Sequence, residues 1–415
     1  MTALARRAFL STLAFSCASA LPVAARAGGF EVAQQSAMAA GTGGAATGRV
    51  DHAAAAWFCP AALADGGGLR TELGVTFALV AIHAASLPQA PEAPWEADTE
   101  SPVATPAYLY ASYAWADWAA GLAVNTPFGS RIDWPQGWAQ RFDVVSSQIQ
   151  FLRLSPLVAY RLGPVHLGAG PQIDIGRLYV KRATNHIVEE GSSAMVLSGV
   201  GAGAHLSAFA ALGEHVGLGL SYRSRADVAL SGDADFNVPE PLAASYPDQH
   251  VSADFALPDR IAAGLALKAG PVRGLLDLSL TLWSVNDELA IDFEDPATAD
   301  RRQVNDWRNS LALRGGVEWA PAAELVLRAG FYGDGIPGAP PPEERLSPSS
   351  PGSVRIAATG GVTGNISSFL SVDAFYEHMR LIERASSSED APLASYRGYA
   401  HVFGLALRAH AGGKP

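Results

Sequence analysis

The chain has 415 residues, of which 29 are Lys or Arg and 40 are Asp or Glu, so its formal net charge is −11. An acidic surface of this kind repels phosphate groups, and we expect neither nucleic acid nor anionic lipid headgroups as partners. Its two cysteines are Cys17 and Cys59. Because a cleavage site is predicted between them, no intramolecular disulfide and no cysteine-based metal site is expected.

Residues 1–27 have the features of a secretory signal peptide. Arg6 and Arg7 precede an apolar stretch that is too short to span a bilayer, and Ala25-Arg26-Ala27 offers a small-x-small cleavage site. The arginine pair also fits a twin-arginine export signal, and Cys17 fits a lipoprotein signal. Ordinary secretion is favoured, because the rest of the chain predicts a barrel that crosses the inner membrane unfolded.

Residues 28–66 do not fit a strand pattern. Gly41, Gly43, Gly44 and Gly48 interrupt a run of alanines, and Asp51 precedes a second alanine run. The segment is small in side-chain volume and weakly amphipathic. It is interpreted either as a flexible periplasmic linker or short helix pair, or as a plug that fits inside a tube.

The uncharged stretch from Gly191 to Gly213 decides between helices and strands. Its length suits a transmembrane helix, but apolar residues alternate with small and polar ones at every second position. A barrel wall requires this alternation, whereas a lipid-exposed helix does not. The glycines at 199, 201 and 203 would also weaken a helix by about 1 kcal/mol each. We therefore expect a strand.

The same alternation predicts fourteen strands, most of them near the about 9–11 residues that a tilted strand needs to cross a bilayer. Strands of a soluble β-sandwich are usually shorter, about 5–6 residues. The predicted fold is all-β, a transmembrane antiparallel β-barrel. The expected strands cover 69–84, 105–115, 117–125, 147–161, 164–181, 194–211, 214–230, 257–269, 272–293, 307–319, 322–333, 353–364, 367–381 and 396–409.

The connections alternate between tight turns and long segments, as outer-membrane barrels require. Ala116-Asp117, Gly163-Pro164 and Gly270-Pro271 are tight, whereas 126–146 and 231–256 are long and rich in Pro, Ser or acids. Several tryptophans near strand ends are candidates for the aromatic girdles at the membrane interfaces. They are Trp115, Trp118, Trp134, Trp138, Trp283, Trp307 and Trp319.

A set of short motifs, in order along nearly the whole chain, resembles the FadL-type outer-membrane transporters of long-chain fatty acids. The N-terminal part has Gly29-Phe30, a glycine-rich stretch, Asp51, and Cys59-Pro60-Ala61 where the family has Asn-Pro-Ala. Further matches are Pro127-Phe128-Gly129, Trp138 with Arg141-Phe142, Ser155-Pro156, Trp307-Arg308 and Leu327–Phe331. Cysteine in place of the family's asparagine leaves the amide hydrogen bond at that position in question.

The resemblance implies four parts: a signal peptide (1–27), an N-terminal hatch inside the lumen (28–66), a barrel of fourteen strands (67–411) and a C-terminal tail (412–415). It also implies a monomer surrounded by outer-membrane lipids. Its expected function is passive transport of hydrophobic small molecules, long-chain fatty acids or similar, by capture in a lumen pocket and lateral release through the wall. The alternative is a structural or adhesive barrel, whose lumen would be filled by charge pairs.

The resemblance also suggests ligand-binding residues. Phe30 matches an N-terminal aromatic that reaches into the pocket, and Arg177 and, more weakly, Arg308 match basic positions for a carboxylate. The alternative for both arginines is a lumen salt bridge with an acid such as Asp174 or Asp277. Phe128, Trp138 and Phe142 are expected to line an entry groove in a loop, or else to be rim aromatics.

Enzymatic functions are not indicated. The sequence has no Gly-x-Ser-x-Gly, Walker or His-Glu-x-x-His motif, and no histidines at metal-ligand spacing. Asp233-Ala-Asp235-Phe-Asn237 opens like a calcium loop but lacks the glycine and the terminal glutamate. No cofactor and no metal is expected.

Overall fold

The computed structural model describes residues 29–49, 51–186, 189–296, 298–336, 341–387 and 392–412. The predicted signal peptide (1–27) and the end of the predicted tail (413–415) lie outside the described residues. The helical elements are α2 Ala37–Ala40, α3 Ala55–Phe58, η1 Pro60–Asp65, η2 Glu240–Ser245, η3 Trp283–Val285 and η4 Glu343–Arg345. The first ten strands are β1 Gly68–Ser86, β2 Glu96–Asp98, β3 Ala107–Trp115, β4 Trp118–Asp133, β5 Ser146–Leu162, β6 Val165–Asn185, β7 Glu190–Leu212, β8 Val216–Arg223, β9 Ala226–Asn237 and β10 Gln249–Leu257. The others are β11 Arg260–Ala269, β12 Val272–Thr281, β13 Glu288–Phe293, β14 Arg301–Val304, β15 Ser310–Ala322, β16 Leu325–Ile336, β17 Arg355–Asn365, β18 Leu370–Ala385 and β19 Ala394–Ala411.

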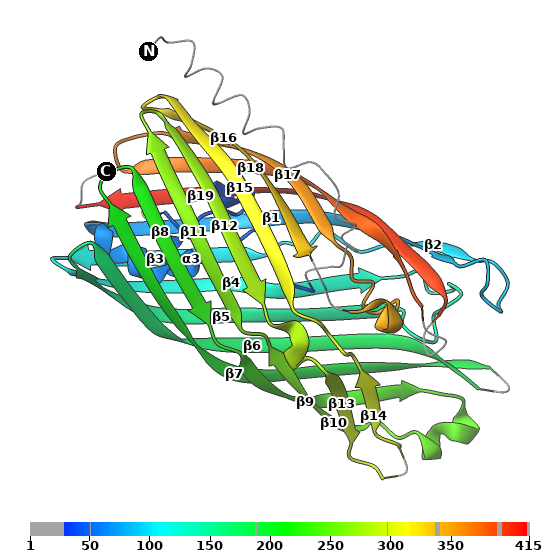
Figure 1. Ribbon diagram of the computed structural model, residues 1–415. Coiled ribbons are helices and arrows are strands. Elements are labelled where there is room, and N and C mark those ends of the chain that lie inside the picture. The colour runs from blue at the N-terminus through cyan, green and yellow to red at the C-terminus, as the bar shows by residue number, and fades with distance from the viewer. Residues whose placement is uncertain are drawn as a thin grey trace.

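The strands form one closed antiparallel barrel (Figure 1). β1 pairs with β19 from Leu69↔Ala411 to Ser86↔Ala394, which joins the two ends of the sheet. The wall has fourteen strands, because β8 with β9 and β10 with β11 each form one wall strand, while β2 and the β13–β14 hairpin are additions. The predicted fold class is confirmed.

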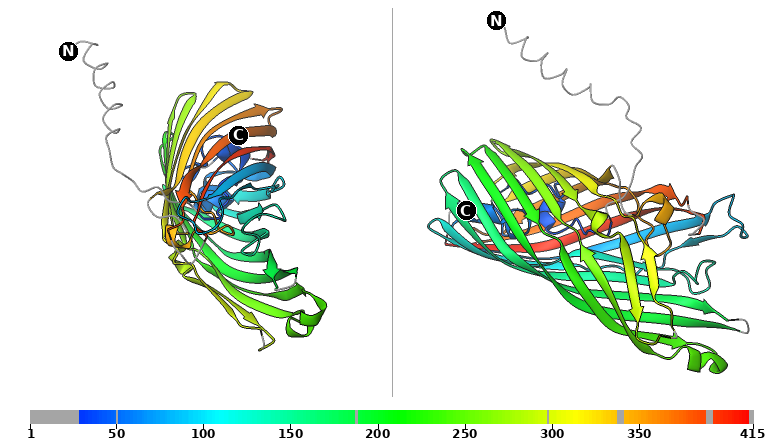
Figure 2. Two further views of the ribbon diagram at one scale, coloured as in Figure 1. Left: turned by 90° about the vertical axis from the view of Figure 1, so that its right-hand side faces the viewer. Right: turned by 60° about the horizontal axis from the view of Figure 1, so that its bottom comes forward.

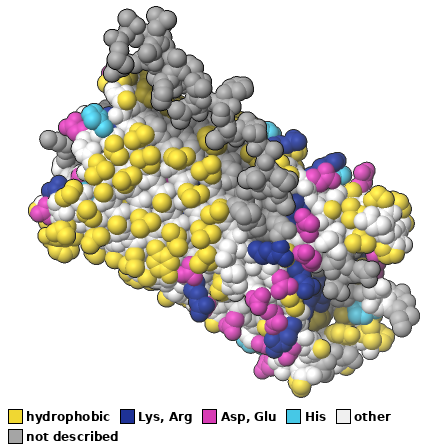
Figure 3. Space-filling model, in the orientation of Figure 1, with side chains coloured by type: hydrophobic (Ala, Val, Ile, Leu, Met, Phe, Trp, Pro, Cys, Tyr) yellow, Lys and Arg dark blue, Asp and Glu magenta, His cyan; other side chains and the backbone are white. Residues whose placement is uncertain are grey.

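The outer surface is divided into an apolar part and a charged part. Toward the short turns, Leu218, Leu220 and Leu276 are exposed on the outside, and Figure 3 shows hydrophobic side chains gathered there. Trp115 and Trp319 are about half exposed beside these turns, as a girdle requires. The girdle prediction is wrong for other tryptophans, since Trp134, Trp138 and Trp283 are buried.

The alternation of side chains changes phase between β8 and β9. In β8 the odd positions up to Arg223 face inward, whereas in β9 the even positions from Ala226 onward are the buried ones. β9 and β10 therefore have apolar inner faces, while Asp227, Asp233 and Asp254 are exposed outside. A polar outer face does not suit lipid. This end of the wall, which also has the long loops, therefore stands in water (Figure 3).

The N-terminal segment (29–66) lies inside the barrel, where the strands enclose it (Figure 2). Nearly all of its described residues from Ala33 to Ala64 are buried. Its elements α2, α3 and η1 contact the inner faces of strands on opposite sides of the wall, from β5 and β6 to β17 and β18. None of the helices in the described ranges has the length and apolarity needed to cross a membrane.

Candidate functional site in the barrel lumen

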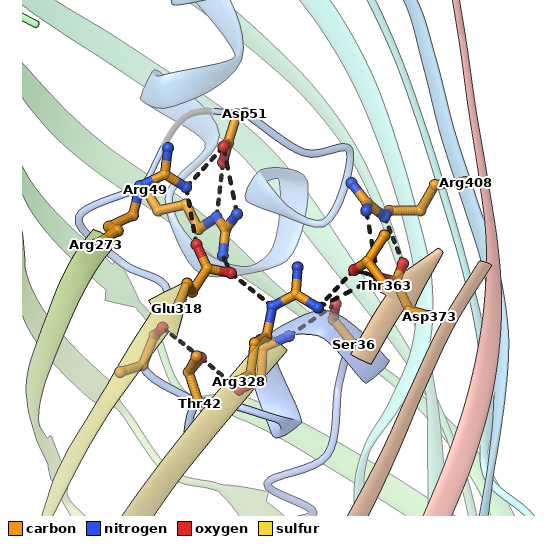
Figure 4. A network of polar contacts seen from close by, with 12 residues as sticks. Ser36, Thr42, Arg49, Asp51, Arg273, Glu318, Arg328, Thr363, Asp373 and Arg408 are labelled. Carbon is orange, nitrogen blue, oxygen red and sulfur yellow. Dashed lines mark hydrogen bonds and ion pairs between the residues drawn. The ribbon is translucent and has the colours of Figure 1, made fainter. Parts of the chain in front are cut away.

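The part of the lumen toward the short turns holds a buried network of ion pairs around Glu318 of β15 (Figure 4). Arg49 of the N-terminal segment donates to Glu318 at 2.7 Å, and Arg328 of β16 donates at 2.6 Å. Arg273 of β12 bridges Glu318 and Asp51, at 3.1 and 2.7 Å. The predicted hatch residue Asp51 thus takes part in fixing the N-terminal segment to the wall.

A second buried acid, Asp373 of β18, continues this network. It pairs with Arg408 of β19, lies 3.6 Å from Arg328, and accepts a hydrogen bond from Thr363. Strands β15, β16, β18 and β19 are therefore linked on the inside by arginine–carboxylate contacts, which are geometrically specific and strong when buried. β17 joins them through the hydroxyl of Thr363.

Backbone contacts fix the N-terminal segment elsewhere. Asp277 of β12 accepts from the backbone N–H groups of Ala46 and Thr47, at 3.0 and 2.9 Å. Gly43 has a φ of +68°, and a Cβ there would lie 2.3 Å from the carbonyl oxygen of Phe331. Only glycine allows this close approach to the wall.

Cys59, Pro60 and Ala61 lie against β6, β7 and β8. The Cys59 thiol is fully buried, with Sγ 3.5 Å from the carbonyl oxygen of Ala208 and 3.8 Å from that of Leu220. Ala61 donates its backbone N–H to Ser207 at 2.9 Å. Burial raises the pKa of the Cys59 thiol to about 12, so the thiol stays neutral. A thiol forms weaker hydrogen bonds than the side-chain amide of the asparagine that the family has at this position.

The part of the lumen toward the long loops is apolar. Phe30 lies among four aromatic rings, with centroid distances of 4.8 Å to Trp283, 5.6 Å to Phe255, and 5.7 Å to Phe128 and to Trp307. We call this packed cluster of apolar side chains around Phe30 the apolar chamber. Its buried members are Phe128, Phe151, Leu178, Met195, Leu197, Ala226, Val228, Leu230, Ala234, Val251, Ala253, Phe255, Leu257, Trp283 and Ile291.

The wall has a break in pairing beside the chamber, which we call the β3–β4 seam. β3 pairs with β4 only as far as Leu109↔Val124, although β4 continues to Asp133. Beyond Val124, β4 has no pairing with β3. There the backbone N–H of Val32 donates to the carbonyl of Pro127, and the backbone N–H of Gly129 donates to the carbonyl of Phe30, both at 2.9 Å. A short piece of the N-terminal segment therefore takes the place of β3 there.

The predictions for the two arginines have different outcomes. Arg177 is exposed on the outer face of β6, between the inward-facing Gly176 and Leu178. It does not face the lumen, and the prediction that it contacts a ligand carboxylate there is wrong. Its expected partner Asp174 pairs with Arg153 instead, at 2.7 Å. Arg308 is exposed and lines an open polar depression of about 540 Å³ together with Trp307.

The three residues predicted to line an entry groove lie partly in the wall and partly in a loop. Phe128 belongs to β4 and not to a loop, and its ring lies in the apolar chamber. Trp138 is buried, stacks on Trp134 at 4.4 Å, and donates its indole N–H to Val144, so it packs the core of a long loop and does not line a groove. Phe142 is half-buried, with the Arg141 guanidinium 4.5 Å above its ring.

Sequence reasoning missed several chamber residues. The sequence pattern predicts Trp283 in the girdle and does not single out Phe151 or Phe255, although all three are buried in the chamber. Val251, Ala253 and Phe255 alternate with Ser252 and Asp254 in β10, but the sequence alone does not say that here the apolar side faces inward. Within the described residues, no group of three His, Cys, Asp or Glu side chains is placed to hold a metal ion.

A lipid-facing barrel whose lumen holds a polar-anchored N-terminal segment and an apolar chamber defines a class, the outer-membrane transport barrels. More specifically, the chain belongs to the outer membrane protein transport family (OMPP1/FadL/TodX), whose model matches residues 18–409. This is a family of outer-membrane transporters for hydrophobic compounds and not of enzymes. No match was found among curated proteins.

Solved structures show the same fold at low identity. A Pseudomonas aeruginosa FadL homologue is similar with a TM-score of 0.79 and 19% identity, covering 92% of this chain and 99% of that chain. The Pseudomonas putida toluene transporter TodX has a TM-score of 0.71 and 15% identity, over 90% and 98%. The Ralstonia pickettii toluene transporter TbuX has a TM-score of 0.70 and 16% identity, over 90% and 97%.

Proposed function

We propose that the chain captures hydrophobic small molecules in the apolar chamber and releases them sideways into the outer membrane. The observation that carries the proposal is the apolar inner face of β5, β6, β7, β9 and β10 at the end that stands in water. Apolar side chains inside a barrel gain nothing from facing a wet channel. They suit a ligand that gains about 0.8 kcal/mol for each CH₂ it buries.

The N-terminal segment acts as the hatch in this proposal. Phe30 occupies the chamber with its own ring, half-buried among the aromatic side chains. Cargo and Phe30 compete for the same apolar surface, so capture displaces Phe30. Because Phe30 and Val32 also complete the edge of β4, the same displacement frees the β3–β4 seam, which is the proposed route of lateral release.

Two chemical types of cargo are consistent with the similar solved structures, which include a FadL homologue and toluene transporters. Long-chain fatty acids and aromatic hydrocarbons both have apolar bodies that fit a chamber of aromatic and branched side chains. A structural or adhesive barrel, the alternative, is expected to have a lumen filled by charge pairs and no such apolar chamber.

The proposal is tested by adding side-chain volume to the chamber. Ala253 faces into it from β10, while Ala229 is exposed on the outside of β9. Overpacking a filled space costs about 1–3 kcal/mol, so Ala253→Trp should lower uptake of radiolabelled decanoate and toluene by about tenfold or more. Ala229→Trp, the matched control, should transport like the wild type.

Uptake is measured in cells that depend on this barrel, with heat-modifiable migration on gels to show that each variant is folded. Equal uptake by the wild type and Ala253→Trp would contradict capture in the chamber. Uptake by the wild type no faster than by cells without the barrel would contradict transport altogether.

A further inference from the structure

Arg177 of β6 is a guanidinium on the outer face of the wall for which the proposed function has no role. Its side chain is exposed, and it forms no ion pair with any residue in the described ranges. Lys181 lies four residues further along the same face of β6 and is also without an ion pair in that part of the chain. Two cations therefore point away from the lumen with no acidic partner.

Arg177 lies at the edge of the apolar surface of β6 that faces the long loops. Between the tight turn at 163–164 and Arg177, the outward positions of β6 are Val165, Leu167, Ala169, Pro171, Ile173 and Ile175. A strand rises about 3.3 Å per residue and tilts by about 45°, so Val165 to Ile175 spans about 23 Å of membrane. The apolar band of outer-membrane barrels is about 25 Å tall. Arg177 is thus the first outward residue beyond the hydrocarbon, at the level of the outer leaflet.

Hydrogen-bonding side chains flank Arg177 on both neighbouring strands. The register places Gln150 of β5 and Ser198 of β7 directly opposite it, and both are exposed. A guanidinium, an amide and a hydroxyl therefore form one polar row across three strands. The next outward row toward the short turns is apolar and exposed, and it consists of Leu152, Ile175 and Val200.

The nearby acids do not neutralise this row. The outward positions of β5, and those of β7 from Ser192 onward, carry no acid. Asp133 of β4 pairs with Arg131 at 2.7 Å, and Asp233 and Asp235 belong to β9, two strands from β6. The row around Arg177 therefore carries a positive charge directly above an apolar surface.

We propose that Arg177, with Gln150 and Ser198, binds a phosphate of lipid A, the phosphorylated glycolipid of the bacterial outer leaflet. The acyl chains of such a lipid would lie on the apolar row below, and its phosphate would lie at the level of Arg177. Guanidinium groups bind phosphate through two parallel hydrogen bonds, and Lys181 adds attraction for an anion. The net charge of −11 is a sum over the whole chain and does not describe this face. The inference goes beyond the proposed function and does not depend on it.

The test compares lipid A with the same lipid after removal of its phosphates. Each lipid is titrated into the folded barrel in detergent, and bound lipid is counted by native mass spectrometry. Arg177→Gln should weaken binding of lipid A by about 5- to 10-fold and change binding of the dephosphorylated lipid by less than about twofold. Arg177→Lys, which keeps the charge but loses the fork of donors, should weaken lipid A binding less. Heat-modifiable migration on gels shows that each variant is folded.

Arg161→Gln is the matched control. Arg161 lies at the short-turn end of β5 and pairs with Asp117 at 2.9 Å, so its loss should change neither affinity. Equal loss of both lipids in Arg177→Gln, no loss of lipid A, or an equal loss of lipid A in Arg161→Gln would overturn the inference. Wild-type binding of phosphatidylglycerol as tight as that of lipid A would also overturn it, because the face would then select any anionic lipid.

Discussion

Glu318 is the residue on which attachment of the N-terminal segment depends most. It is 5% exposed and accepts hydrogen bonds from three arginines, one of them Arg49 of the segment. Removing one member of a buried ion pair leaves its partners charged and unpaired, which costs about 3–5 kcal/mol. A glutamate in a solvent-exposed ion pair contributes little to the free energy of folding.

Glu318→Gln should therefore loosen the segment and raise the ion conductance of the barrel in planar bilayers. Glu288→Gln is the matched control, because Glu288 pairs with Arg302 at 2.7 Å outside the lumen, where both side chains are exposed. It should leave the conductance unchanged. An identical conductance for Glu318→Gln and the wild type would show that the network does not hold the segment in place.

Residue roles could be predicted only in part. Phe30, Phe128, Asp51 and Cys59 lie in the chamber or at the contact of the N-terminal segment with the wall, at positions that the family motifs mark. The Arg177 prediction failed because one step along a strand exchanges inside for outside. Toward the long loops both faces carry polar and apolar residues, so composition does not give the orientation.

At the level of elements, the β3–β4 seam is where movement is expected. Glu31 and Phe128 are antiparallel bridge partners, and the Cα separation of such a pair, about 4.5–5.5 Å, suits a disulfide. In a Cys59→Ser background, oxidised Glu31→Cys/Phe128→Cys should therefore lose decanoate uptake. Addition of reductant should restore it to the level of the same protein never oxidised, which controls for the loss of Phe128. Full uptake through the oxidised form would exclude release at the seam.

The Cys59 thiol can report movement of the N-terminal segment. At pH 8 the Cys59 thiol is buried and neutral, with its pKa raised from 9.0 to about 12 by burial. Maleimide should therefore label it slowly, and decanoate should speed labelling by about tenfold if cargo shifts the segment's equilibrium by about 1.4 kcal/mol. Ser368→Cys in a Cys59→Ser background, exposed in a short turn, should react at the same rate with or without decanoate. Cargo-independent labelling of Cys59 would contradict coupling to the segment.

The strands themselves were largely predictable. Period-two alternation located at least part of each of the fourteen wall strands, because lipid outside and a polar lumen inside impose it. The segment 231–256, expected to be a loop, contains most of β10, and the strand expected over 272–293 ends at Thr281. The change of phase at β8–β9 and the extension of β4 to Asp133 were not foreseen. Beyond the bilayer the outer face is polar, and the rule that the apolar side faces outward no longer applies.

At the scale of the whole molecule, the lumen has two parts with opposite chemistry. Toward the short turns, ion pairs and backbone hydrogen bonds hold the N-terminal segment. Toward the long loops, apolar side chains surround Phe30 while the outer face carries acids. The barrel thus offers an apolar interior where its surroundings are water, and an apolar exterior where they are lipid.

The central claim is that this chamber binds cargo, and a crystal structure with 10-bromodecanoate tests it most directly. The anomalous signal of bromine locates the apolar end of the probe independently of the protein density. We predict a bromine site between Phe255 and Leu230, with the Phe30 ring moved out of the chamber. Bromine only on the lipid-facing surface, with Phe30 still among its four aromatic neighbours, would contradict the account.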